Sequence, residues 1–196
     1  MTELDNETDE SLLTRVQRGD QRAFAALVTR HVKKFHAAAY RMCGDAYESE
    51  DIVQEAFLKL WNKPQMWDAS RGAKFATWFY RIVTNLAIDK VRKKKAVAVG
   101  EVINVFSDTR PSQEEALYEN EKQAALEGAI QSLPDRQKTA LNLCVYEGLS
   151  NREAADVLGV SVKALESLLV RAKSALKEEL IRRGIVPESE RRKSYA

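Results

Sequence analysis

Apolar side chains recur every three or four residues along most of this chain, which is the period of an amphipathic helix. In the first half, the pattern predicts a short helix over residues 11–18 and longer helices over 20–43, 45–61 and 74–95, with a loop over 63–73. Each long helix has one apolar stripe, and we expect the three stripes to face a common core. The stripes comprise Phe24, Leu27, Val28, Val32, Phe35, Ala39 and Met42; then Ile52, Val53, Phe57, Leu60 and Trp61; and finally Phe75, Trp78, Phe79, Ile82 and Leu86.

A break in the helical period separates the two halves of the chain. Residues 96–112 contain Gly100 and Pro111 and show no amphipathic pattern, which predicts a flexible linker. The chain is therefore expected to be all-α, with two small helical domains at 1–95 and 113–196.

The second half resumes with helical signals over 113–131. The segment 132–135 is expected to cap a further helix that ends near Gly148. The tail after Gly184 is polar and is expected to be loose.

Residues 150–171 indicate a helix-turn-helix. Ser150 followed three residues later by Glu153 is a capping box, which starts a helix, and Gly159 ends that helix where the chain must turn. Ser161 then caps a second helix. Ordinary helical hairpins produce parts of this pattern by chance, but the combination favours DNA binding, with the second helix in the major groove.

Charge is distributed unevenly, although the formal net charge is only +2 at pH 7. Hydrophobic residues make up 44% and charged residues 31% of the chain, as in a globular protein. Two neighbouring segments have opposite signs, which predicts separate partners, one of them polyanionic. The acidic segment contains Asp45, Glu48, Glu50, Asp51 and Glu55, and the basic one contains Lys74, Arg81, Lys90, Arg92, Lys93, Lys94 and Lys95.

The remaining composition predicts a cytoplasmic protein. Cys43 and Cys144 lie in apolar helical patterns far apart in sequence, which favours free thiols in a reducing compartment. The acidic N-terminus lacks the apolar core of a signal peptide, and no apolar run approaches the roughly 20 residues that span a bilayer.

No feature of the sequence predicts an enzyme. His31 and His36 are five residues apart and so do not share a helical face at metal-ligand spacing. A phosphate-binding glycine loop and a nucleophile elbow are both missing from the sequence. We therefore expect no metal, no cofactor and no small-molecule substrate.

Four segments together resemble the extracytoplasmic-function group of bacterial alternative sigma factors. They are DIVQEAFLKLW (51–61), FATWFYRIVTNLAIDKVRKKK (75–95), LPDRQKTALNLCVYEGLSNREAADVLGVS (133–161) and VRAKSAL (170–176). The resemblance implies a region 2 domain that recognises and melts the promoter −10 element, and a region 4 domain that binds the −35 element. It also implies binding to core RNA polymerase, through the β′ clamp coiled coil and the β flap, and to a cognate anti-sigma factor, often membrane-bound.

One helix face in the first domain carries the expected polymerase contact. Asp51, Gln54, Glu55 and Leu58 follow i, i+3, i+4, i+7 spacing and so share a face that is acidic with an apolar centre. By itself this pattern also fits a merely solvated acidic face. The resemblance implies that it docks on the clamp coiled coil.

The resemblance implies −10 recognition by the helix over 74–95. Arg81 and Asn85 lie one turn apart beside the loop that carries Trp67, and in similar proteins the residue matching Asn85 lines a pocket for a flipped base. Phe75 and Trp78 lie on the apolar stripe and are better explained as core. The expected phosphate contacts are Tyr80, Lys90, Arg92 and Lys93.

The expected −35 contacts lie on the second helix of the helix-turn-helix. Arg171 and Lys173 match basic positions of the family, whereas Glu166 and Leu168 stand where members commonly have basic residues, which leaves the −35 sequence open. Glu166 either accepts a hydrogen bond from cytosine N4 or faces solvent. The full set is Ser161, Lys163, Glu166, Ser167, Arg171 and Lys173.

A helix-turn-helix regulator with a helical sensor domain is the alternative. It accounts for residues 150–183 but not for the DIVQEAF segment or for the basic, aromatic helix before the linker. We expect a cytoplasmic sigma factor that an anti-sigma factor can hold at the inner membrane.

Overall fold

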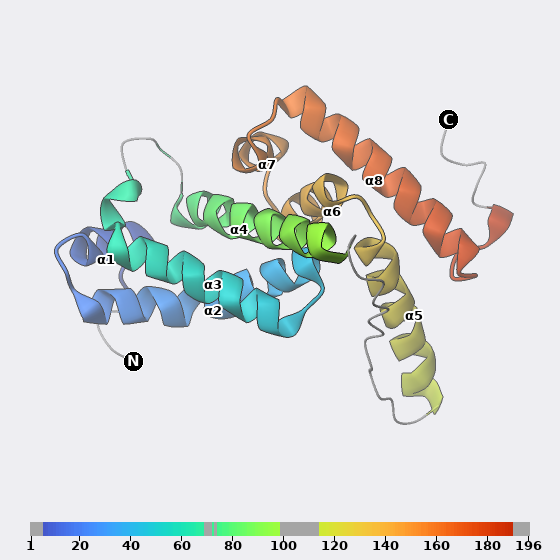
Figure 1. Cartoon of the computed structure of the whole chain (residues 1–196), viewed down its shortest axis with the longest axis horizontal. Coiled ribbons are helices and arrows are strands. Elements are labelled where there is room, and N and C mark those ends of the chain that lie inside the picture. Colours follow the sequence, from blue (N-terminus) through green and yellow to red (C-terminus); the bar gives the residue numbers. More distant parts are fainter. Residues whose placement is uncertain (1–5, 69–71, 73, 99–113, 190–196) are drawn as a thin grey trace.

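The computed structural model describes residues 6–68, 72, 74–98 and 114–189 of the chain (Figure 1). Within these ranges the protein contains helices and no strand, which confirms the all-α class. No helix in the described ranges is long and apolar enough to cross a membrane. The elements are α1 (Asp9–Val16), α2 (Gln21–Cys43), α3 (Ala46–Asn62), the 3-10 turn η2 (Pro64–Met66), α4 (Phe75–Ala98), α5 (Glu114–Gln131), α6 (Asp135–Leu141), the π-helical segment η4 (Asn142–Tyr146), α7 (Asn151–Leu158) and α8 (Val162–Arg182).

Both ends of α2 form as the sequence predicts. Asp20 Oδ1 accepts hydrogen bonds from the backbone N–H groups of Arg22 (2.9 Å) and Ala23 (3.1 Å) and so caps the helix. At the other end, Gly44 takes a left-handed conformation with φ of +74°. A glycine adopts this conformation without the steric cost that a Cβ imposes, which is why the helix ends there.

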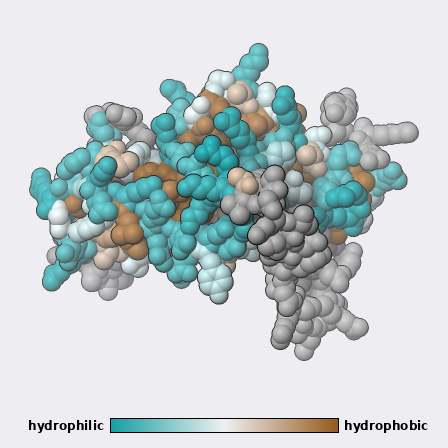
Figure 2. Space-filling model, viewed as in Figure 1, coloured by the Kyte–Doolittle hydropathy of each residue, from teal (hydrophilic) through white to brown (hydrophobic). Residues whose placement is uncertain are grey.

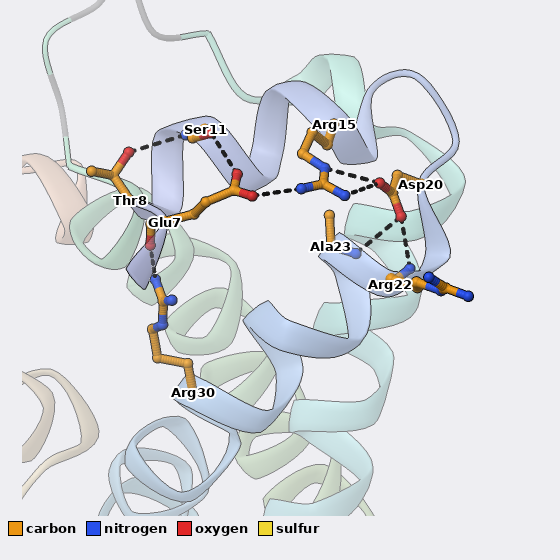
Figure 3. A network of polar contacts seen from close by, with 8 residues as sticks. All are labelled: Glu7, Thr8, Ser11, Arg15, Asp20, Arg22, Ala23 and Arg30. Carbon is orange, nitrogen blue, oxygen red and sulfur yellow. Dashed lines mark hydrogen bonds and ion pairs between the residues drawn. The ribbon is translucent and has the colours of Figure 1, made fainter. Parts of the chain in front are cut away.

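An ionic network joins the start of α1 to α2 (Figure 3). Arg15 of α1 pairs with Glu7 (2.5 Å) and with Asp20 (2.7 Å), and Arg30 of α2 donates to the Glu7 carbonyl oxygen at 2.9 Å. The hydrogen bond from Arg15, followed by those from backbone N–H groups, lowers the pKa of Asp20. The cap of α2 therefore also fixes the short helix α1.

Aromatic rings fill the centre of the core that α2, α3 and α4 share. The Phe35 ring lies 4.6 Å from Phe79 and 4.9 Å from Tyr80, measured between centroids, and Phe57 lies 4.7 Å from Phe79. Phe75 is also fully buried, in agreement with the core interpretation of that residue, whereas Trp78 is half-buried.

Two predictions about helix ends are wrong. The helix α4 continues to Ala98, three residues into the range assigned to the linker; the remaining linker residues lie outside the described ranges, so its flexibility stays a prediction. The helix α6 has no side-chain cap, because its N-cap is Pro134 and the Ser132 hydroxyl donates instead to the Ala129 carbonyl (2.7 Å). After Leu141 the chain changes to π-helical geometry before it turns at Gly148.

The cysteines are free, as predicted, but only partly buried. Burial raises the pKa of both the Cys43 and the Cys144 thiol. Both thiols are therefore protonated and weakly nucleophilic at neutral pH.

The two halves of the chain pack against each other, which the sequence did not predict. The helix α7 lies on α4, and η4 and α6 contact α2 (Figure 1). One apolar cluster contains buried side chains of both halves, among them Phe35 and Tyr80 from the first and Leu143 and Ala155 from the second. A smaller cluster under α8 contains Ile130, Leu133, Leu141 and Ala172. On the face shown in Figure 2, hydrophilic residues cover most of the described surface, with small hydrophobic patches between them.

Candidate nucleic-acid interface

The capping box that starts α7 is fully formed. The Ser150 backbone N–H (3.0 Å) and hydroxyl (2.7 Å) both donate to Glu153 Oε2, and the Glu153 N–H donates back to Ser150 Oγ (3.3 Å). These bonds, with the hydroxyl bond the strongest, lower the pKa of the Glu153 carboxyl. The helix therefore begins at a position that two local side chains determine.

A tight turn then sets α8 against α7. Gly159 has φ of +64°, and the Val160 N–H donates to the Ala155 carbonyl at 3.0 Å. Ala155 and Leu165 are buried where the two helices meet. Ser161 caps α8 by accepting from the Ala164 N–H (3.2 Å). The unit is the helix-turn-helix that the sequence predicted.

The outer face of α8 exposes the expected −35 contacts. Lys163, Glu166, Ser167, Arg171 and Lys173 are all exposed, whereas the Ser161 hydroxyl is used as the cap. Lys163, Ser167 and Arg171 repeat every four residues along one side of α8, and a B-DNA major groove about 12 Å wide admits a helix of about 10–12 Å diameter. The Ser167 hydroxyl donates to the Lys163 carbonyl (3.0 Å) and keeps its lone pairs for a further donor.

The acidic face of α3 is also available. Asp51, Gln54 and Leu58 are exposed, and Glu55 is half-exposed. Among the ion pairs of the described residues, Glu55 has one partner, Lys59, which lies one turn along the same helix at 2.8 Å. An exposed leucine surrounded by acidic and amide groups fits a partner helix that carries arginines.

The basic end of α4 lies against the acidic start of α3. Lys90 pairs with Asp51 at 3.1 Å, and Lys94 pairs with Glu48 at 3.1 Å and with Asp45 at 3.4 Å. The two segments of opposite charge thus pair partly with each other, which the sequence pattern alone did not indicate.

Three other basic residues of α4, Arg81, Arg92 and Lys93, remain accessible. Arg92 pairs with Asp89 (3.4 Å) on its own helix, and Arg92 and Lys93 are exposed. Arg81 and Asn85 are both exposed, one turn apart, as predicted. These four residues can reach a nucleic acid in the arrangement described here.

Trp67 and Tyr80, by contrast, cannot contact DNA in this arrangement. Trp67 is only 4% exposed, and its carbonyl accepts a hydrogen bond from Gln17 Nε2 (3.1 Å) that ties the loop to α1. Tyr80 is fully buried. The predicted roles of these two side chains therefore require a rearrangement.

A hollow of about 840 Å³ lies where the loop before α4 meets the helix-turn-helix. Its wall includes Trp67, Trp78 and Arg81 from the first half and Arg152 and Asp156 from the second. The expected −10 surface therefore borders the helix-turn-helix of the second domain.

Glu147 is the residue that sequence reasoning missed. Its side chain is 4% exposed and lies between the halves, where it accepts hydrogen bonds from Arg41 Nη1 (2.8 Å) and from the Tyr80 hydroxyl. Burial raises the pKa of Tyr80, and the hydrogen bond to Glu147 raises it further. No local signal marks Glu147, because its partners are more than 60 residues away in sequence.

Comparisons with known proteins agree with this architecture. Residues 27–97 match the family model of sigma-70 region 2, and residues 123–176 match that of sigma-70 region 4. The ECF RNA polymerase sigma factor SigW of Bacillus subtilis (strain 168) is 34% identical over 178 residues, which covers 86% of this chain and 94% of that protein. The ECF RNA polymerase sigma-E factor of Escherichia coli (strain K12) is 30% identical over 197 residues, covering 90% and 97% of the two chains.

A solved structure shares the fold over most of its length. The structure of CnrH in complex with the cytosolic domain of CnrY has a TM-score of 0.67 and 27% identity, and covers 90% of this chain and 99% of that one. The alternative, a helix-turn-helix regulator with a sensor domain, is not favoured, because residues 27–97 match sigma-70 region 2 and a sensor domain would not be expected to match it. The chain belongs to the ECF RNA polymerase sigma factors, which are not enzymes and which initiate transcription by binding core RNA polymerase and directing it to promoters.

Proposed function

We propose that three surfaces of this chain divide the work of promoter recognition. The exposed face of α8, from Lys163 to Arg171, binds the −35 element in the major groove. The exposed groups of α4 bind the −10 element, with Asn85 and Arg81 at the separated bases and Arg92 and Lys93 on phosphates. The observation that supports this best is the complete helix-turn-helix, whose second helix exposes a polar face from its first turn onward.

The acidic face of α3 is the proposed docking site for core polymerase. Asp51, Gln54, Glu55 and Leu58 lie on the side of α3 away from the core that Phe57 and Leu60 enter. A charged rim around an apolar centre supports a specific, salt-dependent contact with a basic helix. The β′ clamp coiled coil is the proposed partner, and the β flap is the proposed partner of region 4.

A cognate anti-sigma factor is the proposed regulator. The similar structure of CnrH contains the cytosolic domain of CnrY. A second structure of the same fold is a complex of RpoE with the anti-sigma factor NepR from Bartonella quintana. A membrane-bound partner of this kind would hold the chain at the inner membrane. The test is whether the chain co-sediments with membranes from the native host and no longer does so when the partner is deleted.

Run-off transcription tests the function as a whole. Purified chain added to core RNA polymerase should produce defined transcripts from a library of host promoters, whereas core alone should not. A matched control is the Arg171→Ala variant, which should bind core normally and produce fewer specific transcripts. Sequence-specific duplex binding without any stimulation of core would instead identify a helix-turn-helix regulator.

A further inference from the structure

We propose that Glu147 is the centre of an intramolecular lock that holds this chain in a closed form unable to engage the −35 and −10 elements together. The lock consists of Arg41 and Tyr80 from region 2 and Asn142, Tyr146 and Glu147 from region 4. The proposal rests on the promoter-binding roles proposed above, because it concerns when those surfaces are accessible.

The polar contacts of Glu147 are the first support. A carboxylate removed from water is stable only when charged or hydrogen-bonded partners replace its hydration. Glu147 has two such partners, Arg41 and Tyr80, and both come from the other half of the chain. When the halves separate, all three groups lose these bonds together, so the lock is either formed or broken as a unit.

The π-helical segment explains why Glu147 points at region 2. The Glu147 N–H donates to the Asn142 carbonyl (3.1 Å), five residues back, which places the two residues one above the other on the same face. In a regular α-helix, residues five apart point roughly 140° away from each other. The wider turn therefore lets both side chains reach region 2, and the Asn142 amide donates to the Ala38 carbonyl at 3.1 Å.

The C-terminal end of α2 completes the lock. The last carbonyl groups of a helix have no partner within it. Here Gln131 Nε2, from the end of α5, donates to the Arg41 carbonyl (3.1 Å). The Arg41 guanidinium also lies over the Tyr146 ring, 4.6 Å from its centroid. Arg41 therefore contacts region 4 through its backbone, its charge and its flat face.

The closed form covers part of the expected −10 surface. Tyr80 is buried under Glu147, and Thr77, one turn earlier on α4, donates to Glu153 of the helix-turn-helix (3.4 Å). The −35 and −10 elements lie about 25 base pairs apart, roughly 85 Å along a duplex at 3.4 Å per pair. A chain that binds both elements cannot keep α7 against α4, so the lock must open before promoter engagement.

The test measures the compactness of the free, full-length chain by small-angle X-ray scattering. Glu147→Gln keeps the shape of the side chain but removes the charge that holds Arg41, and we expect the radius of gyration to rise by roughly 3 Å or more as the closed population falls. Arg41→Gln should give the same change. The control is Glu10→Gln, an equivalent change at an exposed position of α1, which should scatter as the wild type does.

A double variant makes the test sharper. If Arg41 and Glu147 act through each other, combining Arg41→Gln with Glu147→Gln should open the chain little further than either change alone. Circular dichroism confirms that each variant is folded. Folded single variants with the wild-type radius of gyration, or a wild-type chain that is already extended, would overturn the lock.

Function provides a separate readout. With saturating core polymerase, Glu147→Gln should support run-off transcription at the wild-type level, since Glu147 is not among the residues proposed above to bind DNA or core. At limiting promoter DNA, its complex with core should engage the promoter severalfold faster than the wild-type complex, because no closed form has to open. Loss of all transcription by the wild type would refute the sigma activity itself and not the lock, so the two failures are distinguishable. Equal rates of promoter engagement for variant and wild type would count against the lock.

Discussion

Reversing one charge on α3 separates the polymerase-binding role of this helix from its structural role. Glu55 is 46% exposed and pairs only with Lys59 (45% exposed) among the described ion pairs, one helical turn away. An exposed pair at this spacing stabilises a helix by about 0.3–0.5 kcal/mol. Glu55→Arg removes that pair and places a second positive charge beside Lys59, at a similar cost. The total of about 1 kcal/mol or less is small beside a folding stability of about 5–15 kcal/mol.

The expected effect on core binding is larger. If α3 docks on a basic helix of core polymerase, the reversed charge meets a like charge at the interface and leaves the partner's cation without its acceptor. We expect affinity for core to fall about 10- to 100-fold, equivalent to about 1.4–2.8 kcal/mol. The variant is informative because the expected loss of binding free energy exceeds the expected loss of folding stability.

Fluorescence anisotropy of labelled chain titrated with core polymerase measures this affinity, and thermal unfolding followed by circular dichroism measures stability. Glu10→Arg reverses a charge on the exposed surface of α1 and serves as the matched control, with unchanged affinity expected. The affinity loss should also shrink at high salt, because surface charges are screened. An unchanged affinity for core, with helicity preserved, would remove this face of α3 from the interface.

Three further outcomes are expected. Asn85→Ala should reduce promoter melting far more than −35 binding, because Asn85 is exposed on α4 one turn from Arg81. Normal permanganate reactivity of thymines near the start site would contradict its role. Arg171→Ala should lower −35 affinity by about 1–3 kcal/mol and relax sequence preference, whereas Lys93→Ala should weaken binding without changing preference; competition binding with mutated promoters distinguishes them. The lowered pKa of Glu153 stabilises the folded state above its ordinary value of 4.5, and this contribution is lost as the pH falls through the lower folded pKa. The protection factors of the α7 amides, which correct hydrogen exchange for its intrinsic pH dependence, should therefore fall below about pH 4.5, and the same fall in Glu153→Gln would refute the assignment.

The sequence determined the local features because their signals are local. The caps at Asp20 and Ser150 and the turns at Gly44 and Gly159 each depend on residues within one or two helical turns, and all four form as predicted. The apolar period located the helices for the same reason. The exposed faces of α3 and α8 also followed from spacing, since a residue opposite an apolar stripe faces away from the core.

Only the tertiary structure decided which of those faces another element covers. Tyr80 has the sequence context of a DNA-binding residue, yet it is buried because its ring packs on Phe35 and its hydroxyl donates to Glu147 of the other half. Lys90 is paired because α3 brings Asp51 beside it. Glu147 became an interdomain residue through a π-helical turn, which the apolar period does not reveal. These outcomes depend on groups tens of residues away, and a pattern with a period of three to four residues contains no information about them.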